Sequence, residues 1–163
     1  MTDADLIIEN GTIITEGGSF NAALIVANGQ VVAYTEDVSG WDAPERIDAS
    51  GLLVMPGGID VHTHFEEPDP ELLEGFTSGG RSAAAGGLTS VVEMPQARPT
   101  TTTPAQFAEK VQIVKENAVV DMALWAGAIG PPLQSADDLT AMVDLGAAAF
   151  KSFMASSSPL FPA

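Results

Sequence analysis

The two histidines of the chain, His62 and His64, are separated by a single residue and follow the apolar run Ile59-Asp60-Val61. Alternate residues of a β-strand point to the same face, so we expect both imidazoles to project together. Two neutral imidazoles that face one way are suitable ligands for a first-row metal ion. The alternative is a pair of exposed or hydrogen-bonded histidines just past the end of a strand.

Lys151 is the second residue with unusual chemistry, because it lies in the apolar stretch 147–154. Burial of a charged ammonium is unfavourable, so this lysine is either exposed at a sheet edge or has lost its charge. A neutral amine can react with carbon dioxide to give a carbamate, an anion whose two oxygens can bridge two metal ions. Two metal ions about 3.5–4 Å apart can hold a hydroxide at neutral pH.

From residue 53 onward, apolar strand patterns alternate with helical patterns. The expected strands include residues 59–61, 89–94, 122–126 and 148–154, and the expected helices cover 73–85, 104–118 and 135–146. Thr103 and Ser135 are expected to cap the second and third helices. Four strands and three helices in alternation predict parallel βαβ units, whose sites gather at the carboxyl ends of the strands.

An open doubly wound sheet and a closed (β/α)₈ barrel both begin in this way. A complete barrel needs about 250 residues, and residues 53–163 supply about half of that. The expected fold class is therefore α/β, a partial TIM barrel containing the first four strands, and we expect the sequence to be a truncated part of a longer one.

Residues 1–52 read as short strands rather than helices. Asn10-Gly11 and Asn28-Gly29 each stand between apolar runs and predict two hairpins, and a third extended segment is expected around Ile47. We interpret this region as a small structural domain, 1–52, that precedes the barrel domain, 53–163.

The composition excludes several functions. The 163 residues carry a net charge of −16, which disfavours nucleic-acid binding. No apolar run is long enough to span a bilayer, and no leader pattern follows Met1, so we expect a cytoplasmic protein without membrane contacts. The acidity can serve ordinary solubility or reflect a salt-rich host; folding measured against salt concentration separates these two explanations.

The sequence Pro56-Gly57-Gly58-Ile59-Asp60-Val61-His62-Thr63-His64-Phe65 resembles the first metal-binding strand of the cyclic amidohydrolases, members of the amidohydrolase superfamily. Phe150-Lys151-Ser152-Phe153-Met154 is similar to the strand that carries a carboxylated lysine in this family. The segments Gly79–Thr89 and Glu93-Met94-Pro95 extend the resemblance, and residues 1–52 are similar to the first part of the family's small β-sandwich.

The resemblance implies a metal site. His62 and His64 would hold one metal ion, and carboxylated Lys151 would bridge it to a second. Two Zn²⁺ ions are implied for each site of a complete enzyme, although manganese, cobalt or iron also suit such ligands. The implied reaction is hydrolysis of a ring amide by a hydroxide that bridges the metals. Three further residues are weaker candidates for substrate contacts: Glu66, Gln96 and Ser156.

Among the cyclic amidohydrolases, the allantoinases are most similar, on the pattern Glu67-Pro68, Leu73-Glu74-Gly75-Phe76 and Trp125-Ala126-Gly127. This implies conversion of allantoin to allantoate in purine catabolism, a small cyclic amide as substrate, and a homo-oligomer in the full-length form.

Two alternatives within the family remain open. Dihydroorotases typically carry an arginine at the position of Glu66, and hydantoinases or dihydropyrimidinases usually have a tyrosine shortly after the lysine strand, where this chain has Ala155 and Ser156. An alternative of another class is a half-barrel that acts as a non-catalytic assembly or interaction module. Because the chain has no third histidine, we expect the 163 residues alone to be inactive.

Overall fold

The computed structural model describes residues 2–69, 74–156 and 161, and the chain divides into two compact units, Met1–Pro56 and Gly57–Ala163. The first unit includes strand β9 (Leu53–Val54), which pairs in parallel with β3 (Thr12–Thr15). No helix among the described residues is long and apolar enough to cross a membrane.

The N-terminal unit consists of short strands in three small sheets. Their orders are β6-β5-β2-β8, β4-β3-β9 and β1-β7. The remaining strands are β1 (Thr2–Asp3), β2 (Leu6–Glu9), β4 (Gly18–Asn21), β5 (Ala23–Ala27), β6 (Gln30–Thr35), β7 (Trp41–Asp42) and β8 (Glu45–Asp48). Ile7 and Ile25 lie at the centre of the buried cluster of this unit. That these sheets form part of a β-sandwich stays a prediction.

One of the two predicted hairpins is confirmed. β5 and β6 pair antiparallel across Asn28 and Gly29, with Ala27 opposite Gln30. Both turn residues have positive φ, 53° and 71°, as a two-residue hairpin turn of this kind requires.

The hairpin predicted at Asn10-Gly11 is wrong, because β2 and β3 belong to different sheets. Asn10 has φ 64°, but Gly11 is required for close approach: a Cβ there would lie 2.6 Å from Cγ2 of Val54. The turn therefore directs the chain from one sheet into the other rather than back along the same strand. The extended segment predicted around Ile47 is confirmed as β8.

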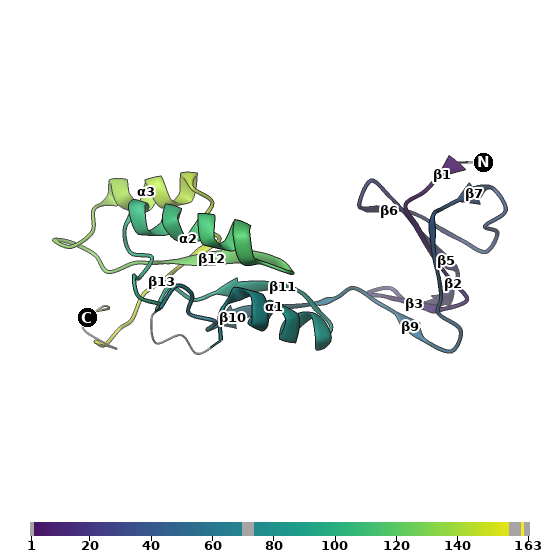
Figure 1. Cartoon of the computed structure of the whole chain (residues 1–163), viewed down its shortest axis with the longest axis horizontal. Helices are drawn as coiled ribbons and strands as arrows, with labels where there is room; N and C mark the ends of the chain where they lie inside the picture. The colour runs from purple at the N-terminus through teal and green to yellow at the C-terminus, as the bar shows by residue number, and fades with distance from the viewer. Residues whose placement is uncertain (1, 70–73, 157–160, 162–163) are drawn as a thin grey trace. The chain divides into compact units, whose positions relative to one another are not determined.

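The C-terminal unit alternates strands and helices along the chain (Figure 1). Its elements are β10 (Gly58–Thr63), α1 (Phe76–Ala85), β11 (Leu88–Glu93), α2 (Pro104–Asn117), β12 (Asp121–Gly127), α3 (Ala136–Asp144) and β13 (Ala149–Lys151). The strands pair in parallel in the order β10-β11-β12-β13. Consecutive order without a reversal is the order of a barrel rather than of a doubly wound sheet, so the predicted half of a (β/α)₈ barrel is confirmed.

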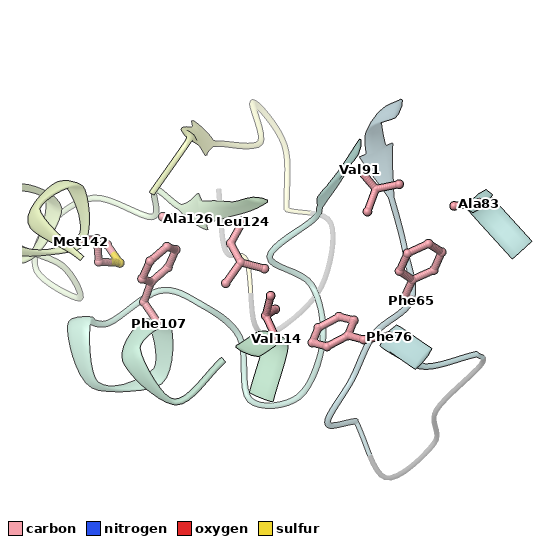
Figure 2. Close-up of a cluster of buried hydrophobic side chains, with 9 residues drawn as sticks. All are labelled: Phe65, Phe76, Ala83, Val91, Phe107, Val114, Leu124, Ala126 and Met142. Atoms are coloured by element: carbon pink, nitrogen blue, oxygen red, sulfur yellow. The ribbon is translucent and has the colours of Figure 1, made fainter. Parts of the chain in front are cut away.

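An apolar layer holds the helices against the sheet (Figure 2). All three helices and the strands contribute buried side chains to it: Phe65, Phe76, Ala83, Val91, Phe107, Val114, Leu124, Ala126 and Met142. Figure 2 shows these side chains spread along the interface from Met142 of α3 to Ala83 of α1. The buried strand residues of this layer belong to β11 and β12, and their burial fixes which face of these two strands is turned towards the helices.

Two helices begin directly after the residues predicted to cap them. The side chain of Thr103 accepts a hydrogen bond from the backbone of Gln106, and Ser135 forms a reciprocal capping box with Asp138. α1 begins at Phe76 after Gly75, and the predicted helix start at Leu73 lies outside the described residues. The last strand is shorter than predicted, ending at Lys151 instead of residue 154.

We expect Phe107→Ala to destabilise the C-terminal unit by about 3–5 kcal/mol, because Phe107 is fully buried and its truncation leaves a cavity. Urea unfolding followed by Trp125 fluorescence, in a Trp41→Phe background, measures this unit alone. Val143→Ala is the matched control, since Val143 is 54% exposed and should change the free energy of unfolding by less than about 0.5 kcal/mol. Equal effects of the two substitutions would contradict this description of the core.

Ser135→Ala should raise the pKa of Asp138 towards its ordinary value. The backbone N–H and the hydroxyl of Ser135 donate to the Asp138 carboxylate at 2.9 and 2.8 Å, and these bonds hold the pKa of Asp138 below 3.8. A lowered folded-state pKa stabilises the fold above the unfolded value, and this contribution is lost as the pH falls through the folded-state pKa. NMR titration of the carboxyl carbon measures the change; because the variant keeps the backbone N–H bond, an unchanged midpoint would refute a contribution of the Ser135 hydroxyl.

Candidate active site at the carboxyl ends of the strands

His62 lies near the end of β10 and His64 directly after it, and both are exposed. Their ring centroids are 5.3 Å apart, with an angle of 42° between the ring planes. The register between β10 and β11 shifts between Asp60 and Thr63, so a β-bulge interrupts strict alternation here. Asp60 accepts a hydrogen bond from the backbone N–H of His62 at 2.9 Å, which supports this irregular strand end.

Glu66 lies beside the histidine pair. Its Oε1 is 3.4 Å from Nδ1 of His64, and its backbone has the positive φ of 60° that is unusual for a residue with a side chain. A carboxylate beside Nδ1 favours a proton on that nitrogen and leaves Nε2 as the lone-pair donor for a metal ion. Glu66 is thus placed to orient an imidazole.

A buried carboxylate forms hydrogen bonds with the segment that carries His64. Glu93, the last residue of β11, has no exposed surface and accepts three hydrogen bonds from the end of β10 and the loop that follows it. Thr63 Oγ1 and the backbone N–H of Phe65 donate to Oε2, both at 3.0 Å, and the N–H of Glu66 donates to Oε1 at 2.8 Å. The loop that carries His64 is therefore attached to the second strand of the barrel.

Lys110 of α2 is the cation that balances Glu93. Its side chain is 2% exposed, and Nζ lies 3.8 Å from Oε1 of Glu93 and donates to the carbonyl oxygen of Met94 at 3.2 Å. Burial lowers the pKa of Lys110, and the nearby charges of Glu93 and Glu66 oppose that shift. The ammonium also lies 5.8 Å from the ring centroid of Phe76.

Lys151 ends β13, two strands away from β11 in the sheet. Its side chain is half-buried, and Nζ lies 5.1 Å from the ring centroid of Phe153. The carbonyl oxygen of Lys151 accepts a hydrogen bond from Ala128 at 2.8 Å, so the strand end is tied to the loop after β12.

These donors match part of a metal site. Two imidazoles are in place, and Lys151 lies at the corresponding end of a later strand. Within the described parts of the chain, no group of three or more His, Cys, Asp or Glu side chains could hold a metal ion. The donor chemistry fits a first-row metal, and a full ligand set needs a modified Lys151 or further donors.

The weaker candidates occupy the same end of the strands. Gln96 is half-buried in the turn after β11, and Ser156 is exposed beyond β13. Arg98 and Asp69 join the loops after β11 and β10, with Nε to Oδ2 and Nη2 to Oδ1 distances of 3.0 Å. This bidentate pair constrains two loops that border the candidate site.

Reasoning from the sequence did not identify the roles of Glu93 and Lys110. A charged residue at the end of the apolar run 88–93 was a usable signal for Glu93, because sites gather at strand ends. Lys110 gave no such signal, since a lysine within a helix is ordinarily exposed.

The chain is similar to a known family and to characterised members of it. The family model described as "Amidohydrolase family" matches residues 53–157. The chain is 44% identical to an allantoinase of Rubrobacter xylanophilus over its whole length, covering 35% of that protein. It is 38% identical to an L-hydantoinase of Paenarthrobacter aurescens, with 95% of this chain and 33% of that protein covered.

Solved structures agree with the observed fold. An L-hydantoinase (dihydropyrimidinase) from Arthrobacter aurescens superposes with a TM-score of 0.88 at 36% identity, over 98% of this chain and 35% of that one. The chain thus spans about a third of the length of the relatives it matches. With a family match over most of its length and these relatives, the chain belongs to the amidohydrolase family.

Proposed function

We propose that this chain forms the metal-binding first half of a barrel that hydrolyses a hydantoin-type cyclic amide, converting allantoin to allantoate. The observation that carries the proposal is the position of His62 and His64 at the end of the first parallel strand, with Lys151 at the end of the fourth. The 44% identity to an allantoinase supports allantoin as the substrate and purine catabolism as the setting.

In this proposal His62, His64 and a carboxylated Lys151 would hold the metal ions. Bound Zn²⁺, or another divalent metal in its place, supplies the Lewis acidity that activates water and polarises the ring carbonyl. Glu66 keeps His64 oriented through Nδ1, 3.4 Å away. We propose that Gln96 and Ser156, on the loops after β11 and β13, contact the ring of the substrate.

The half-barrel needs more chain to act on a substrate. Two imidazoles and one lysine cannot complete two metal sites, and the described residues include no group of three or more His, Cys, Asp or Glu side chains that could hold a metal ion. We therefore propose that the 163 residues alone are inactive and that further strands complete the site, in a protein that is cytoplasmic and homo-oligomeric. A non-catalytic assembly module is the alternative in which the two open sheet edges, β10 and β13, pair with a partner.

A hydantoinase or dihydropyrimidinase activity is the second candidate, favoured by the TM-score of 0.88 with an L-hydantoinase. Dihydroorotase activity is less favoured, because Glu66 lies beside His64 and would repel an anionic substrate there.

We expect Lys151→Ala to reduce the metal bound by the purified chain, measured by elemental analysis after dialysis against Zn²⁺. A carbamate is one of the proposed ligands, and its loss leaves only the two imidazoles. Lys115→Ala is the matched control, because Lys115 is exposed in the last turn of α2. Equal metal content in all three proteins, or none in the parent, would argue against a metal role for Lys151.

The activity itself is tested in a chimera in which this chain replaces the matching first third of the Rubrobacter xylanophilus allantoinase. We expect the chimera to open allantoin in preference to hydantoin or dihydroorotate. His62→Ala or Lys151→Ala should reduce kcat/KM by about 1,000-fold or more, the effect of losing several kcal/mol of transition-state stabilisation. Lys115→Ala should leave it unchanged. A folded, metal-loaded chimera that prefers hydantoin would transfer the assignment to the hydantoinases, and one without activity on any of the three rings would refute it.

A further inference from the structure

We propose that Glu93 is a positioning residue of the candidate metal site: its buried carboxylate holds the segment 63–66 so that Glu66 faces Nδ1 of His64. The inference deepens the proposed function and rests on it for the identity of the histidines as metal ligands.

Glu93 is joined to the segment 63–66 by several hydrogen bonds. Glu93 is fully buried and accepts from three donors, all within four residues that surround His64. Two of these donors are backbone N–H groups, those of Phe65 and Glu66, so the bonds constrain the path of the chain itself. A buried ionised group is tolerated only when it is fully hydrogen-bonded, and here the partners are supplied by the loop that carries the imidazole.

Glu66 connects the hydrogen bonds of Glu93 to the imidazole of His64. Glu66 has φ 60°, a conformation that costs free energy for a residue with a Cβ. Its N–H donates to Glu93 Oε1 at 2.8 Å, the shortest of the three bonds, which compensates for that strain. In this conformation the Glu66 carboxylate reaches to 3.4 Å from Nδ1 of His64. In the part of the chain that the structure describes, Glu93 makes no hydrogen bond or ion pair with either imidazole, so it acts on His64 through Glu66.

The contact with Lys110 favours a carboxylate at position 93. Lys110 lies on the other side of Glu93 and also donates to Met94 O, so the charge of Glu93 is paired within the core. The ion pair and the three accepted hydrogen bonds link α2, the end of β11 and the segment 63–66, and hydrogen bonds to an ionised acceptor are stronger than neutral ones. An apolar residue at position 93 could fill the volume but would leave two backbone N–H groups without an acceptor.

Glu67 provides a matched control within the same loop. Its Oε2 accepts a hydrogen bond of 2.7 Å from the backbone N–H of Phe76 at the start of α1. It is thus a carboxylate of the same type with a structural bond to a backbone N–H, but its bond leads to a helix and not to His64.

The experiment compares Glu93→Gln with Glu67→Gln in the metal-free 163-residue protein by long-range ¹H–¹⁵N NMR of the histidine side chains at about pH 8.5. Glutamine keeps the shape of glutamate, but its NH₂ group cannot accept one set of the donated bonds. We expect His64 to be protonated on Nδ1 in the parent and in Glu67→Gln, and to become a mixture of tautomers in Glu93→Gln.

Zn²⁺ affinity, measured by competition with a chelating dye, is the second readout. We expect Glu93→Gln to weaken binding by about 10- to 100-fold, the range for loss of a group that orients a metal ligand, and Glu67→Gln to leave it unchanged. Thermal unfolding of both variants separates this effect from a general loss of stability, because a merely structural role would lower Tm without moving the His64 signals.

The outcomes distinguish the two proposals. Unchanged His64 signals in a folded Glu93→Gln protein would overturn the positioning role, whatever the metal result. A changed tautomer in Glu93→Gln, together with a parent that binds no Zn²⁺, would support the role of Glu93 in shaping the segment while overturning the proposed metal site. If Glu93→Gln does not fold, Thr63→Val removes one of the three bonds with little change in shape; it must then produce a smaller shift of the same kind, and its absence overturns the inference.

Discussion

A carboxylate without exposed surface must find every hydrogen bond within the protein, and Glu93 meets this requirement at the point where the first two strands of the barrel end. Its donors come from the end of β10 and the loop after it, and its counter-charge comes from α2. Three segments that are distant in the sequence are thereby held in one arrangement. The apolar layer alone could not do this, because hydrophobic contacts favour burial without specifying which backbone groups lie opposite each other.

The parallel sheet carries buried apolar side chains on the face towards the helices and the two histidines at the end of its first strand. Side chains such as Val91, Leu124 and Ala126 are buried against the helices, and they fix the orientation of each strand. The histidines lie at the strand end, where the β-bulge between Asp60 and Thr63 interrupts the alternation. The candidate site residues therefore lie where the regular strand pattern ends, and the buried apolar contacts lie where it continues.

The exposed apolar side chains of the C-terminal unit agree with its length relative to its family. Ile59 and Val61 of β10 are 66% and 58% exposed, unusual values for apolar residues of a parallel strand, which is normally covered on both faces. The relatives that this chain matches are about three times longer. Their additional length is the natural source of cover for such a sheet.

Local signals in the sequence determined much of this protein. The alternation of patterns after residue 53 predicted the parallel strands and their helices, Thr103 and Ser135 predicted two helix starts, and Asn28-Gly29 predicted a hairpin, because each depends on residues close together in the chain. The spacing of His62 and His64 likewise predicted that their side chains lie together.

Tertiary structure decided what depends on distant partners. Asn10-Gly11 has the same local signal as Asn28-Gly29, but pairing of β3 with β4 and β9 takes it into another sheet. Glu93 lies 27 to 30 residues from its three donors and 17 from Lys110, so no local pattern could reveal the network. Sequence specifies backbone preference and periodicity over a few residues, whereas the environment of a buried charge is created only when the strands and helices pack together.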